Sequence, residues 1–313
     1  MQPSTVLVTG GAGFIGSHLV RELLARGHSV RVLDNFVTGK PANLEGVRGD
    51  LTVIEGDLRD VATCGRATVN VDYVFHVAAL PSVARSVADP RTSHDVNVNG
   101  MFNILMASRD AGVRRFIYSS SSSVYGNTPA LPKNEVMHPS PLSPYAVSKL
   151  TGEYYCGIFS NLYGLHTVSM RYFNVFGPRQ DPTSQYSGVI SRFCTSLLRG
   201  EALILNGDGG QTRDFTYVAN VVHANILACS AEIAGPLIVN IGAGRRTSLL
   251  ELLGALERLT GREAKPIFQP ERQGDVRDSQ ADISLAKTKL GYEPIVDFAD
   301  GLADTLAYFR SLV

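Results

Sequence analysis

The most constraining feature of this sequence is a glycine-rich turn between two apolar segments near its N-terminus. The segment VTGGAGFIGSHL contains Gly11-x-Gly13-x-x-Gly16, and Gly10 precedes this motif. Glycines at this spacing let a strand turn tightly into a helix and let the backbone approach a pyrophosphate, which the N–H groups and positive dipole of a helix N-terminus attract. The pattern predicts a strand over TVLVTG, a helix from Phe14 to Arg26 and a dinucleotide site between them; a glycine-rich turn without a ligand is the alternative.

The following segments alternate between short β-branched runs and amphipathic patterns. HSVRVLD, LTVIEGD, VDYVFHVAA, VRRFIYSS and HTVSMRYF are typical of strands, and helical patterns lie around residues 97–111 and 146–163. This alternation favours an α/β fold with a doubly wound parallel sheet. We expect a dinucleotide-binding domain over residues 1–172 and a smaller, mixed substrate-binding lobe over residues 173–313, from which a segment near residues 214–242 returns to the first domain. The Gly- and Pro-rich segment FNVFGPRQDPTSQYSG is expected to be a long functional loop.

Charge and cysteine content argue against several classes of protein. Lys plus Arg and Asp plus Glu number 29 each, so the net charge is 0 and no nucleic-acid partner is indicated. We find neither a basic segment followed by an apolar one at the N-terminus nor a long uncharged apolar run, so we expect no membrane partner and a cytoplasmic protein. The four cysteines lack CxxC spacing and are expected to be buried thiols; His76, His94 and His223 lack metal-ligand spacing, so no metal is expected.

The second predicted strand ends in Asp34, which Asn35 follows. An acid about 20 residues after the glycine motif typically hydrogen-bonds a ribose hydroxyl, and a carboxylate repels the 2′-phosphate of NADP. The pair therefore favours NAD, and a simple turn residue is the alternative for Asp34. The segment GDL, which contains Asp57 and Leu58, ends a third strand. At this place the protein could hydrogen-bond the edge of the adenine base.

The segment SPLSPYAVSKLTGEYY holds Tyr145-x-x-x-Lys149. Ser143 suits an N-cap and Pro144 the first helical position, so both side chains would share one helical face near the helix N-terminus. A neighbouring ammonium and the helix dipole favour a phenolate, so we expect a lowered pKa for Tyr145, which would act as a base. The spacing is common by chance, but here it follows a dinucleotide motif and a strand that ends in five serines.

Together these motifs resemble the extended short-chain dehydrogenase/reductases that act on nucleotide sugars, and most closely the UDP-hexose 4-epimerase family. The resemblance spans nearly the whole chain and is carried by TGGAGFIG, LDNF, GDL, HVAAL, NVNG, SSSSVYG, YAVSK, RYFNVFGPRQ, RDFTYV and ERQGDVRDSQAD. It implies a Rossmann domain with tightly bound NAD, a UDP-sugar substrate and inversion at C4 through a transient 4-keto sugar. It also implies a homodimer through a four-helix contact, made by the helices around residues 97–111 and 146–163.

The resemblance assigns roles to three groups of residues. The expected catalytic residues are Ser121, Tyr145 and Lys149. The expected NAD-binding residues are Gly10, Gly13, Phe14, Ile15, Gly16, Asp34, Asn35, Gly39, Asp57, Leu58, Ala78, Ala79, Tyr145, Lys149 and Phe173. The expected substrate-binding residues are Ser82, Ser121, Ser123, Tyr145, Asn174, Arg213, Arg272, Asp275 and Ser279. Guanidinium groups suit a diphosphate, and solvated surface charges are the alternative for the two arginines.

Four positions distinguish this chain from related enzymes. Sugar-nucleotide 4,6-dehydratases carry an Asp-Glu pair where this chain has Ser122 and Ser123, and UDP-glucuronate decarboxylases carry a glutamate there. Pro81 and Ser279 stand where UDP-glucose-type epimerases carry lysine and tyrosine. The small Ser279 predicts room for an N-acetyl group at the sugar C2, so we expect UDP-N-acetylhexosamines as substrates and leave UDP-glucose and UDP-galactose open. Alternatively, Ser279 is small for packing reasons, and Pro81 or the loop in the 180s sets sugar preference.

Two other functions stay open. UDP-glucuronate 4-epimerases share SSSSVYG but usually carry threonine where this chain has Asn174. A non-catalytic NAD-sensing protein on the same fold would usually have a broken Tyr–Lys pair, and here the pair is intact.

Overall fold

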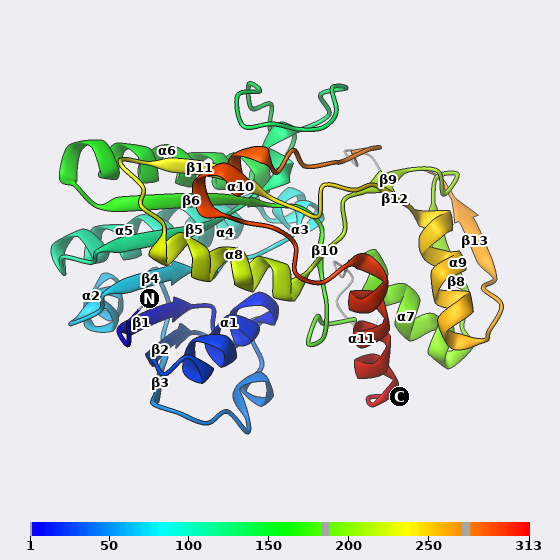
Figure 1. The fold of residues 1–313 in the computed structure, drawn as a ribbon, viewed down its shortest axis with the longest axis horizontal. Coiled ribbons are helices and arrows are strands. Elements are labelled where there is room, and N and C mark those ends of the chain that lie inside the picture. Colours follow the sequence, from blue (N-terminus) through cyan, green and yellow to red (C-terminus); the bar gives the residue numbers. More distant parts are fainter. Residues whose placement is uncertain (1, 183–187, 271–275) are drawn as a thin grey trace.

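A seven-stranded parallel sheet with helices on both faces forms the larger part of the molecule (Figure 1). The computed structural model describes residues 2–182, 188–270 and 276–313. The strand order is β11-β6-β5-β4-β1-β2-β3, which confirms the doubly wound class. The strands are β1 (Thr5–Thr9), β2 (Ser29–Asp34), β3 (Leu51–Glu55), β4 (Tyr73–His76), β5 (Arg115–Ser121), β6 (His166–Tyr172) and β11 (Leu237–Ile241).

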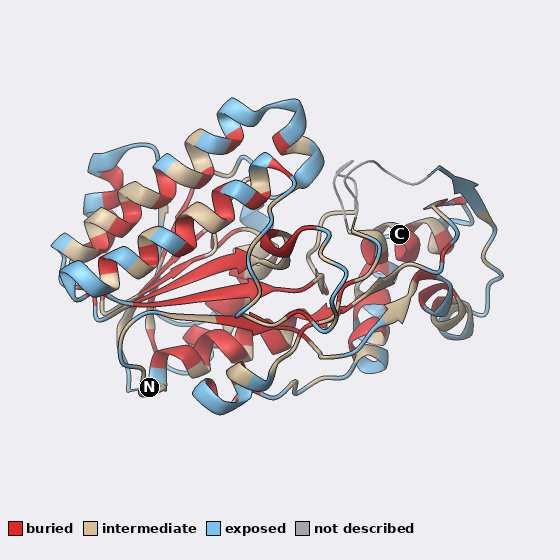
Figure 2. Cartoon of the chain, turned by 90° about the horizontal axis from the view of Figure 1, so that it is seen from above, coloured by how far each residue is buried: buried red, intermediate tan, exposed pale blue. Residues whose placement is uncertain are grey.

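Alternating side chains on the strands pack into two separate cores, one on each face of the sheet. On β1, Val6 and Val8 pack into the core beneath α1 and α8, whereas Leu7 packs into the core beneath α2, α5 and α6. The strands are accordingly buried between helices whose outer faces are exposed (Figure 2). The longer helices of these layers are α1 (Phe14–Ala25), α2 (Val61–Thr68), α5 (Met101–Asp110), α6 (Pro144–Tyr163) and α8 (Val218–Ser230).

Shorter elements connect these layers. They are α3 (Val83–Ala88), α4 (Pro90–His94), α10 (Ser284–Leu290), the 3-10 helices Pro41–Leu44 and Ser122–Tyr125, and the π-helix Asp95–Gly100. The helix expected from residue 97 therefore begins with π geometry and becomes α-helical only at Met101.

The smaller lobe has its own core beside the carboxyl end of the sheet. Its helices α7 (Val189–Arg199), α9 (Leu249–Thr260) and α11 (Phe298–Arg310) enclose apolar side chains with the parallel pair β8 (Leu203–Asn206) and β13 (Pro266–Gln269). Two further pairs are β7 (Val175–Phe176) with β10 (Thr216–Tyr217), and β9 (Thr212–Arg213) with β12 (Thr247–Ser248). Although α8 and β11 lie with the large sheet, the division of the chain into two domains stays a prediction.

Helix α6 begins where the sequence predicts. The Ser143 side chain accepts a hydrogen bond from Ala146 N, Pro144 occupies the first turn, and Gly164 ends the helix with a φ of 70°. Tyr145 therefore lies in the first turn, and Lys149 lies one turn later on the same side.

The glycine-rich turn brings backbone against backbone. Gly13 N donates to Gly10 O at 3.0 Å, and a Cβ atom on Gly16 would lie 2.1 Å from the same oxygen. Gly10 itself has a φ of 69°, and a Cβ there would lie 2.7 Å from the Ala78 Cα atom on the neighbouring strand connection. Only glycine fits these two places, so the turn draws α1 close to the end of β1.

The remaining expectations concern thiols, membranes and metals. All four cysteines are buried and free. Within the described ranges no helix is long and apolar enough to cross a membrane, and no group of three or more His, Cys, Asp or Glu side chains is placed to hold a metal ion. A cytoplasmic location stays a prediction.

We predict that Gly16→Ala lowers the free energy of unfolding by about 1–3 kcal/mol, because the added methyl group overlaps the Gly10 carbonyl. Gly65→Ala is the matched control: Gly65 lies inside α2 with no atom within 4 Å of an added Cβ, so this change should stabilise by about 0.5–1 kcal/mol. Urea unfolding of both variants measures the difference. A Gly16→Ala protein as stable as the parent would show that the turn can shift at little cost.

Candidate active site

The carboxyl ends of the parallel strands open into a cavity of about 1040 Å³, which the smaller lobe also lines. Small-molecule sites usually measure about 300–1,000 Å³, so this cavity has room for more than one ligand. Every predicted site residue in the described part of the chain lines it: Gly10, Gly13, Phe14, Ile15, Gly16, Asp34, Asn35, Gly39, Asp57, Leu58, Ala78, Ala79, Ser82, Ser121, Ser123, Tyr145, Lys149, Phe173, Asn174, Arg213 and Ser279. Arg272 and Asp275 lie outside the described residues.

Ser121, Tyr145 and Lys149 come together from two elements. Ser121 ends β5, whereas Tyr145 and Lys149 lie on α6. The Ser121 hydroxyl lies close enough to the Tyr145 phenol for hydrogen bonding between them to lower the pKa of Tyr145. Lys149 Nζ donates to the Ser119 carbonyl oxygen at 2.8 Å and lies 5.8 Å from the centre of the Tyr145 ring. The phenol thus has a hydroxyl and an ammonium nearby.

The expected lowering of the Tyr145 pKa is wrong for the chain by itself. Burial raises the pKa of Tyr145 above its ordinary value, and the hydrogen bond with Ser121 opposes this rise only in part. Burial also lowers the pKa of Lys149 from 10.5 to about 8. Loss of water penalises both charged forms, and the ammonium bonds to the backbone instead of to the phenol. The chain alone therefore favours the neutral phenol, and a phenolate needs a further positive charge at the site.

The serines have different partners. The buried Ser119 hydroxyl donates to Tyr172 Oη at 3.1 Å, and the buried Ser120 hydroxyl donates to Glu153 Oε1 at 2.5 Å. Ser123 Oγ is buried without a hydrogen-bond partner among the described residues, although Ser123 lines the cavity. A buried hydroxyl without a partner is costly, so Ser123 is suited to bind a ligand.

Asp34 hydrogen-bonds the turn around it and also lines the cavity. Its carboxylate accepts hydrogen bonds from Ala12 N at 2.9 Å and from a backbone N–H of its own turn. Each oxygen has a second lone pair, which leaves room for a ribose hydroxyl. Together with the glycine-rich turn, which presents bare backbone, Asp34 gives the cavity features that a dinucleotide requires.

Asp57 is held by Asn35 and by Arg59, and Arg59 was not among the site residues predicted from the sequence. Asn35 Nδ2 donates to Asp57 at 2.8 Å, and the Arg59 guanidinium donates to both of its carboxylate oxygens. The hydrogen bond from Arg59 is the main reason why the pKa of Asp57 lies well below its usual value. Asp57 therefore stays ionised at the rim of the cavity.

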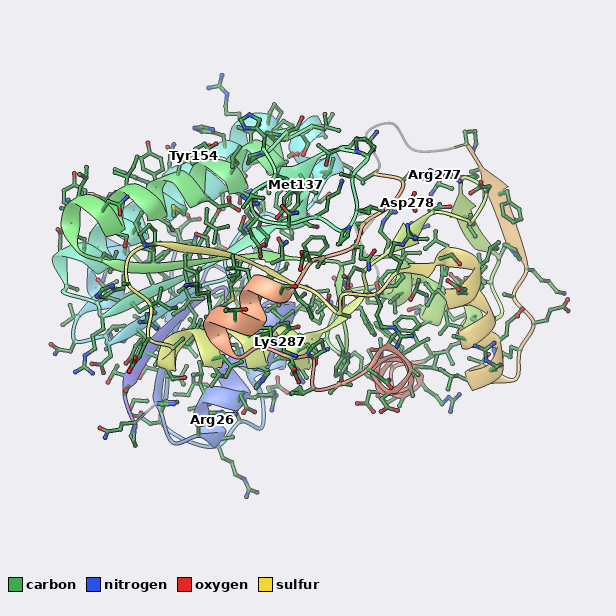
Figure 3. The ribbon with its side chains drawn as sticks, turned by 45° about the horizontal axis from the view of Figure 1, so that its top comes forward. Arg26, Met137, Tyr154, Arg277, Asp278 and Lys287 are labelled. Atoms are coloured by element: carbon green, nitrogen blue, oxygen red, sulfur yellow. The ribbon has the colours of Figure 1, made fainter. Side chains whose placement is uncertain are left out.

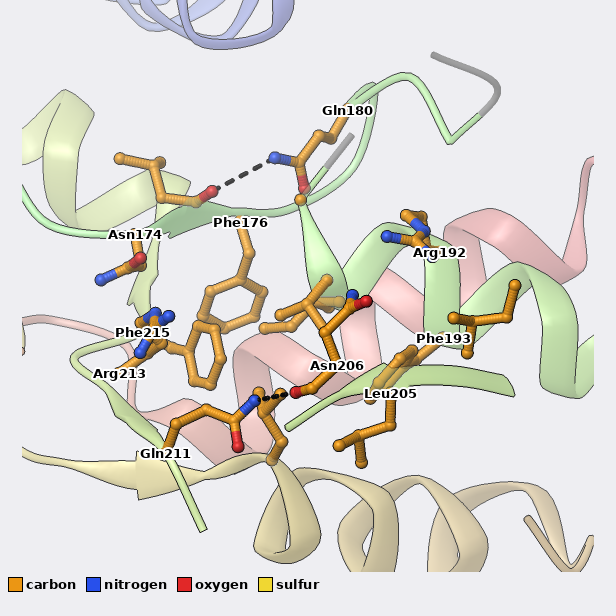
Figure 4. A pocket seen from close by; sticks show the side chains of 16 residues that line it. Asn174, Phe176, Gln180, Arg192, Phe193, Leu205, Asn206, Gln211, Arg213 and Phe215 are labelled. Carbon is orange, nitrogen blue, oxygen red and sulfur yellow. Dashed lines mark hydrogen bonds between the residues drawn. The ribbon is translucent and has the colours of Figure 1, made fainter. Parts of the chain in front are cut away.

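A second cavity of about 220 Å³ lies in the smaller lobe and shares lining residues with the first (Figure 4). Asn174 and Arg213 line both cavities. Asn174 Nδ2 donates to Ser279 Oγ at 3.0 Å, which joins two predicted substrate residues that are far apart in the sequence. The second cavity combines rings with amides, and its side chains include Phe176, Phe193, Leu205, Asn206, Gln211 and Phe215.

The sequence analysis did not identify several cavity residues. Lys40 Nζ lies 3.1 Å from Asp181 Oδ2, and this ion pair joins the segment after β2 to the segment after β7. Lys133, Arg179 and Gln180 also line the cavity. The motif GPRQDP was visible in the sequence, but only the folded chain places Arg179 next to the helix that follows the glycine-rich turn, where Arg179 Nε donates to Ser17 Oγ at 3.0 Å.

Comparison with known proteins defines the family. Residues 6–242 match the family model of the NAD dependent epimerase/dehydratase family. Over 309 residues the chain is 41% identical to a UDP-glucose 4-epimerase of Mycolicibacterium smegmatis, and the match covers 97% of this chain and 98% of the relative. The chain therefore belongs to the NAD dependent epimerase/dehydratase family, and the extended short-chain dehydrogenase/reductase interpretation, the enzyme class and NAD as cofactor are confirmed.

Solved structures show the same fold with ligands. A UDP-N-acetylglucosamine 4-epimerase of Methanobrevibacter ruminantium in complex with UDP-N-acetylmuramic acid is 38% identical, with a TM-score of 0.96 and all of both chains covered. A Thermus thermophilus UDP-glucose 4-epimerase complex with NAD is 39% identical, with a TM-score of 0.91 and coverage of 99% of this chain and 100% of that one.

The hydrogen bond between Ser121 and Tyr145 predicts a pH effect. Because this bond lowers the pKa of Tyr145, Ser121→Ala should raise that pKa. A base with a higher pKa is deprotonated only at higher pH, so the rising limb of the pH profile of kcat/KM should move to higher pH. Ser121→Thr keeps the hydroxyl and should keep the limb in place. An unmoved limb in Ser121→Ala would show that another group titrates.

Proposed function

We propose that this chain is a UDP-sugar 4-epimerase that keeps its NAD bound through the catalytic cycle. The observation that carries the proposal is the meeting of Ser121, Tyr145 and Lys149 in the same cavity as the glycine-rich turn. The segment after Ser121 supplies hydroxyls where related dehydratases supply acids, which suits oxidation and re-reduction without elimination of water. The similar UDP-sugar 4-epimerases support the same activity.

Each residue of the trio has one task. Ser121 hydrogen-bonds the C4 hydroxyl of the sugar, and Tyr145 Oη takes the proton from that hydroxyl. When bound, NAD supplies a positively charged ring that accepts a hydride and gives it back. After the sugar has turned over, C4 would take the hydride back on its opposite face, and Tyr145 returns the proton to the C4 oxygen. Lys149, fixed by the Ser119 carbonyl, adds positive charge close to the phenol and stabilises its ionised form.

The substrate would be held by its nucleotide end. Arg213 lies between the two cavities, where a guanidinium suits the diphosphate. The second cavity, with its rings and amides, suits a pyrimidine base. Arg272 and Asp275 are proposed to complete this grip by resemblance, although they lie outside the described residues.

Ser279 is proposed to admit an N-acetyl group at C2. The side chain is small and buried, and its hydroxyl bonds to Asn174 Nδ2. We therefore expect UDP-N-acetylglucosamine and UDP-N-acetylgalactosamine as substrates. UDP-glucuronate remains the alternative, because the buried cation Lys133 also lines the cavity; its ammonium donates to Thr128 O and, at 2.7 Å, to Thr128 Oγ1.

A panel of UDP-sugars tests the activity directly. Purified protein without added NAD should invert C4 of its substrates, and denatured protein should release NAD. Tyr145→Phe should keep the NAD and lower kcat by roughly 10²–10⁴-fold, because it loses only the general base. Tyr163→Phe, an exposed tyrosine at the end of the same helix, is the control. Release of NADP alone, or steady conversion of free NAD to NADH, would contradict the proposal.

Ser279→Tyr tests the sugar preference. A ring at this position would fill space beside C2, and packed sites do not deform freely. We expect kcat/KM to fall for the two N-acetylated sugars and to persist for UDP-glucose and UDP-galactose. If the parent ignores N-acetylated sugars, or the variant turns them over unchanged, Ser279 does not control this preference.

We also propose a homodimer through α5 and α6. Helix α6 exposes Val147, Tyr154, Ile158 and Leu162, and Tyr154 projects away from the sheet (Figure 3). An exposed apolar stripe of this kind marks an interaction surface. Ile158→Asp should therefore give a monomer in sedimentation velocity, whereas Leu312→Asp, an exposed change near the C-terminus, should leave a dimer. A monomeric parent would rule out the dimer.

A further inference from the structure

A buried ion pair lies directly behind the catalytic trio. Arg171 Nη2 lies 2.7 Å from Glu153 Oε2, and Arg171 Nε donates to Glu153 Oε1 at 2.9 Å. Their side chains are 3% and 0% exposed. Removing two charges from water is costly, and such pairs can often be replaced by apolar residues without loss of stability. The reason for this pair must therefore be sought in what it positions.

The pair holds the strand that carries Ser121. In the register of β5 and β6, Ser120 lies opposite Arg171, so both side chains leave the sheet toward α6. The Ser120 hydroxyl donates to the same Glu153 oxygen that accepts from Arg171 Nε. The residue just before Ser121 is thus fixed to α6 through its side chain.

The pair also lies next to the rest of the trio. Glu153 follows Lys149 by one helical turn, and Lys149 Nζ donates to the Ser119 carbonyl. Helix α6 is therefore tied to β5 at two successive residues, Ser119 and Ser120. With these two ties, the end of the strand cannot shift along α6 without breaking a buried hydrogen bond.

The segment after Ser121 is held by the same cation. The Arg171 guanidinium lies 4.7 Å from the centre of the Tyr125 ring, and Tyr125 ends the 3-10 helix that follows Ser121. Tyr125 Oη donates to Asn240 Oδ1 on β11 at 2.7 Å. The serine-bearing segment is therefore fixed on both sides of Ser121.

We propose that Glu153, clamped by Arg171, is a positioning residue that sets the placement of Ser121 relative to Tyr145 and Lys149. The proposal rests on the proposed epimerase function. Glu153 touches neither the cavity nor a reacting atom; it acts through Ser120 and through the helix that it shares with Lys149.

The carboxylate also affects the charge of Lys149. Burial lowers the pKa of Lys149, and the negative charge of Glu153 opposes that change. The other groups near Lys149 are Tyr145 from α6, Tyr118 from β5 and His76 from β4. Burial lowers the pKa of His76 to about 3, so it is neutral and offers no compensating charge. Glu153→Gln should therefore lower the pKa of Lys149 further.

The test compares Glu153→Gln, the double variant Glu153→Gln with Arg171→Met, and the control Glu293→Gln, which removes an exposed ion pair with Lys287. Glu153→Gln should keep bound NAD, change KM by no more than about twofold and lower kcat roughly 10- to 100-fold, because small misplacements of reacting groups are costly. The basic limb of its pH profile should move to lower pH. Glu293→Gln should match the parent.

The double variant separates positioning from stability. It removes the uncompensated buried cation, so it should regain stability in urea unfolding and still have a low kcat. If kcat returns together with stability, or if Glu153→Gln has the kcat and pH profile of the parent, Glu153 is merely structural. If Glu153→Gln does not fold, the kcat of the folded double variant alone distinguishes the two roles: a low kcat supports positioning, and a kcat equal to that of the parent contradicts it. An inactive parent on every UDP-sugar would instead overturn the epimerase function, and this inference with it.

Discussion

The contact between Gly16 and the Gly10 carbonyl is the constraint on which the rest of the structure depends. Because neither glycine has a side chain, the first turn of α1 lies against the end of β1. The N–H groups of this first turn have no partner within the helix, and they point to the carboxyl edge of the sheet. The same edge receives the ends of β2, β4 and β5. The cavity is thus a product of backbone geometry before any catalytic side chain contributes.

The two lobes contribute different kinds of groups to this cavity. The sheet and α6 supply the residues suited to proton transfer, and they are held rigidly by buried hydrogen bonds. The smaller lobe supplies an arginine and an amide-lined recess, which are suited to gripping one end of a long ligand. The proposed inversion through a 4-keto sugar fits this separation, because the reacting ring would turn over while the anchored end stays in place.

Much of the site could be read from the sequence, since its signals are local. The glycine spacing, the capped start of α6 and the Tyr145–Lys149 pair each depend on fewer than about 15 neighbouring residues. What the sequence could not show depends on distant contacts. The pKa of Tyr145 is set by burial, and the partnership of Glu153 with Arg171 depends on the register of β5 and β6. The ion pair of Lys40 with Asp181 likewise joins segments about 140 residues apart.

The hydrogen bond between Asn174 and Ser279 has a consequence for how this enzyme can diverge. Ser279 gives space to one part of the cavity, and its hydroxyl orients an amide that faces both cavities. Glycine or alanine would leave as much space but would no longer hydrogen-bond the Asn174 amide. A large residue would neither leave this space nor orient the amide in the same way. The side chain at position 279 therefore affects both the space in the cavity and the orientation of the amide, and a lineage that enlarges this side chain changes both at once.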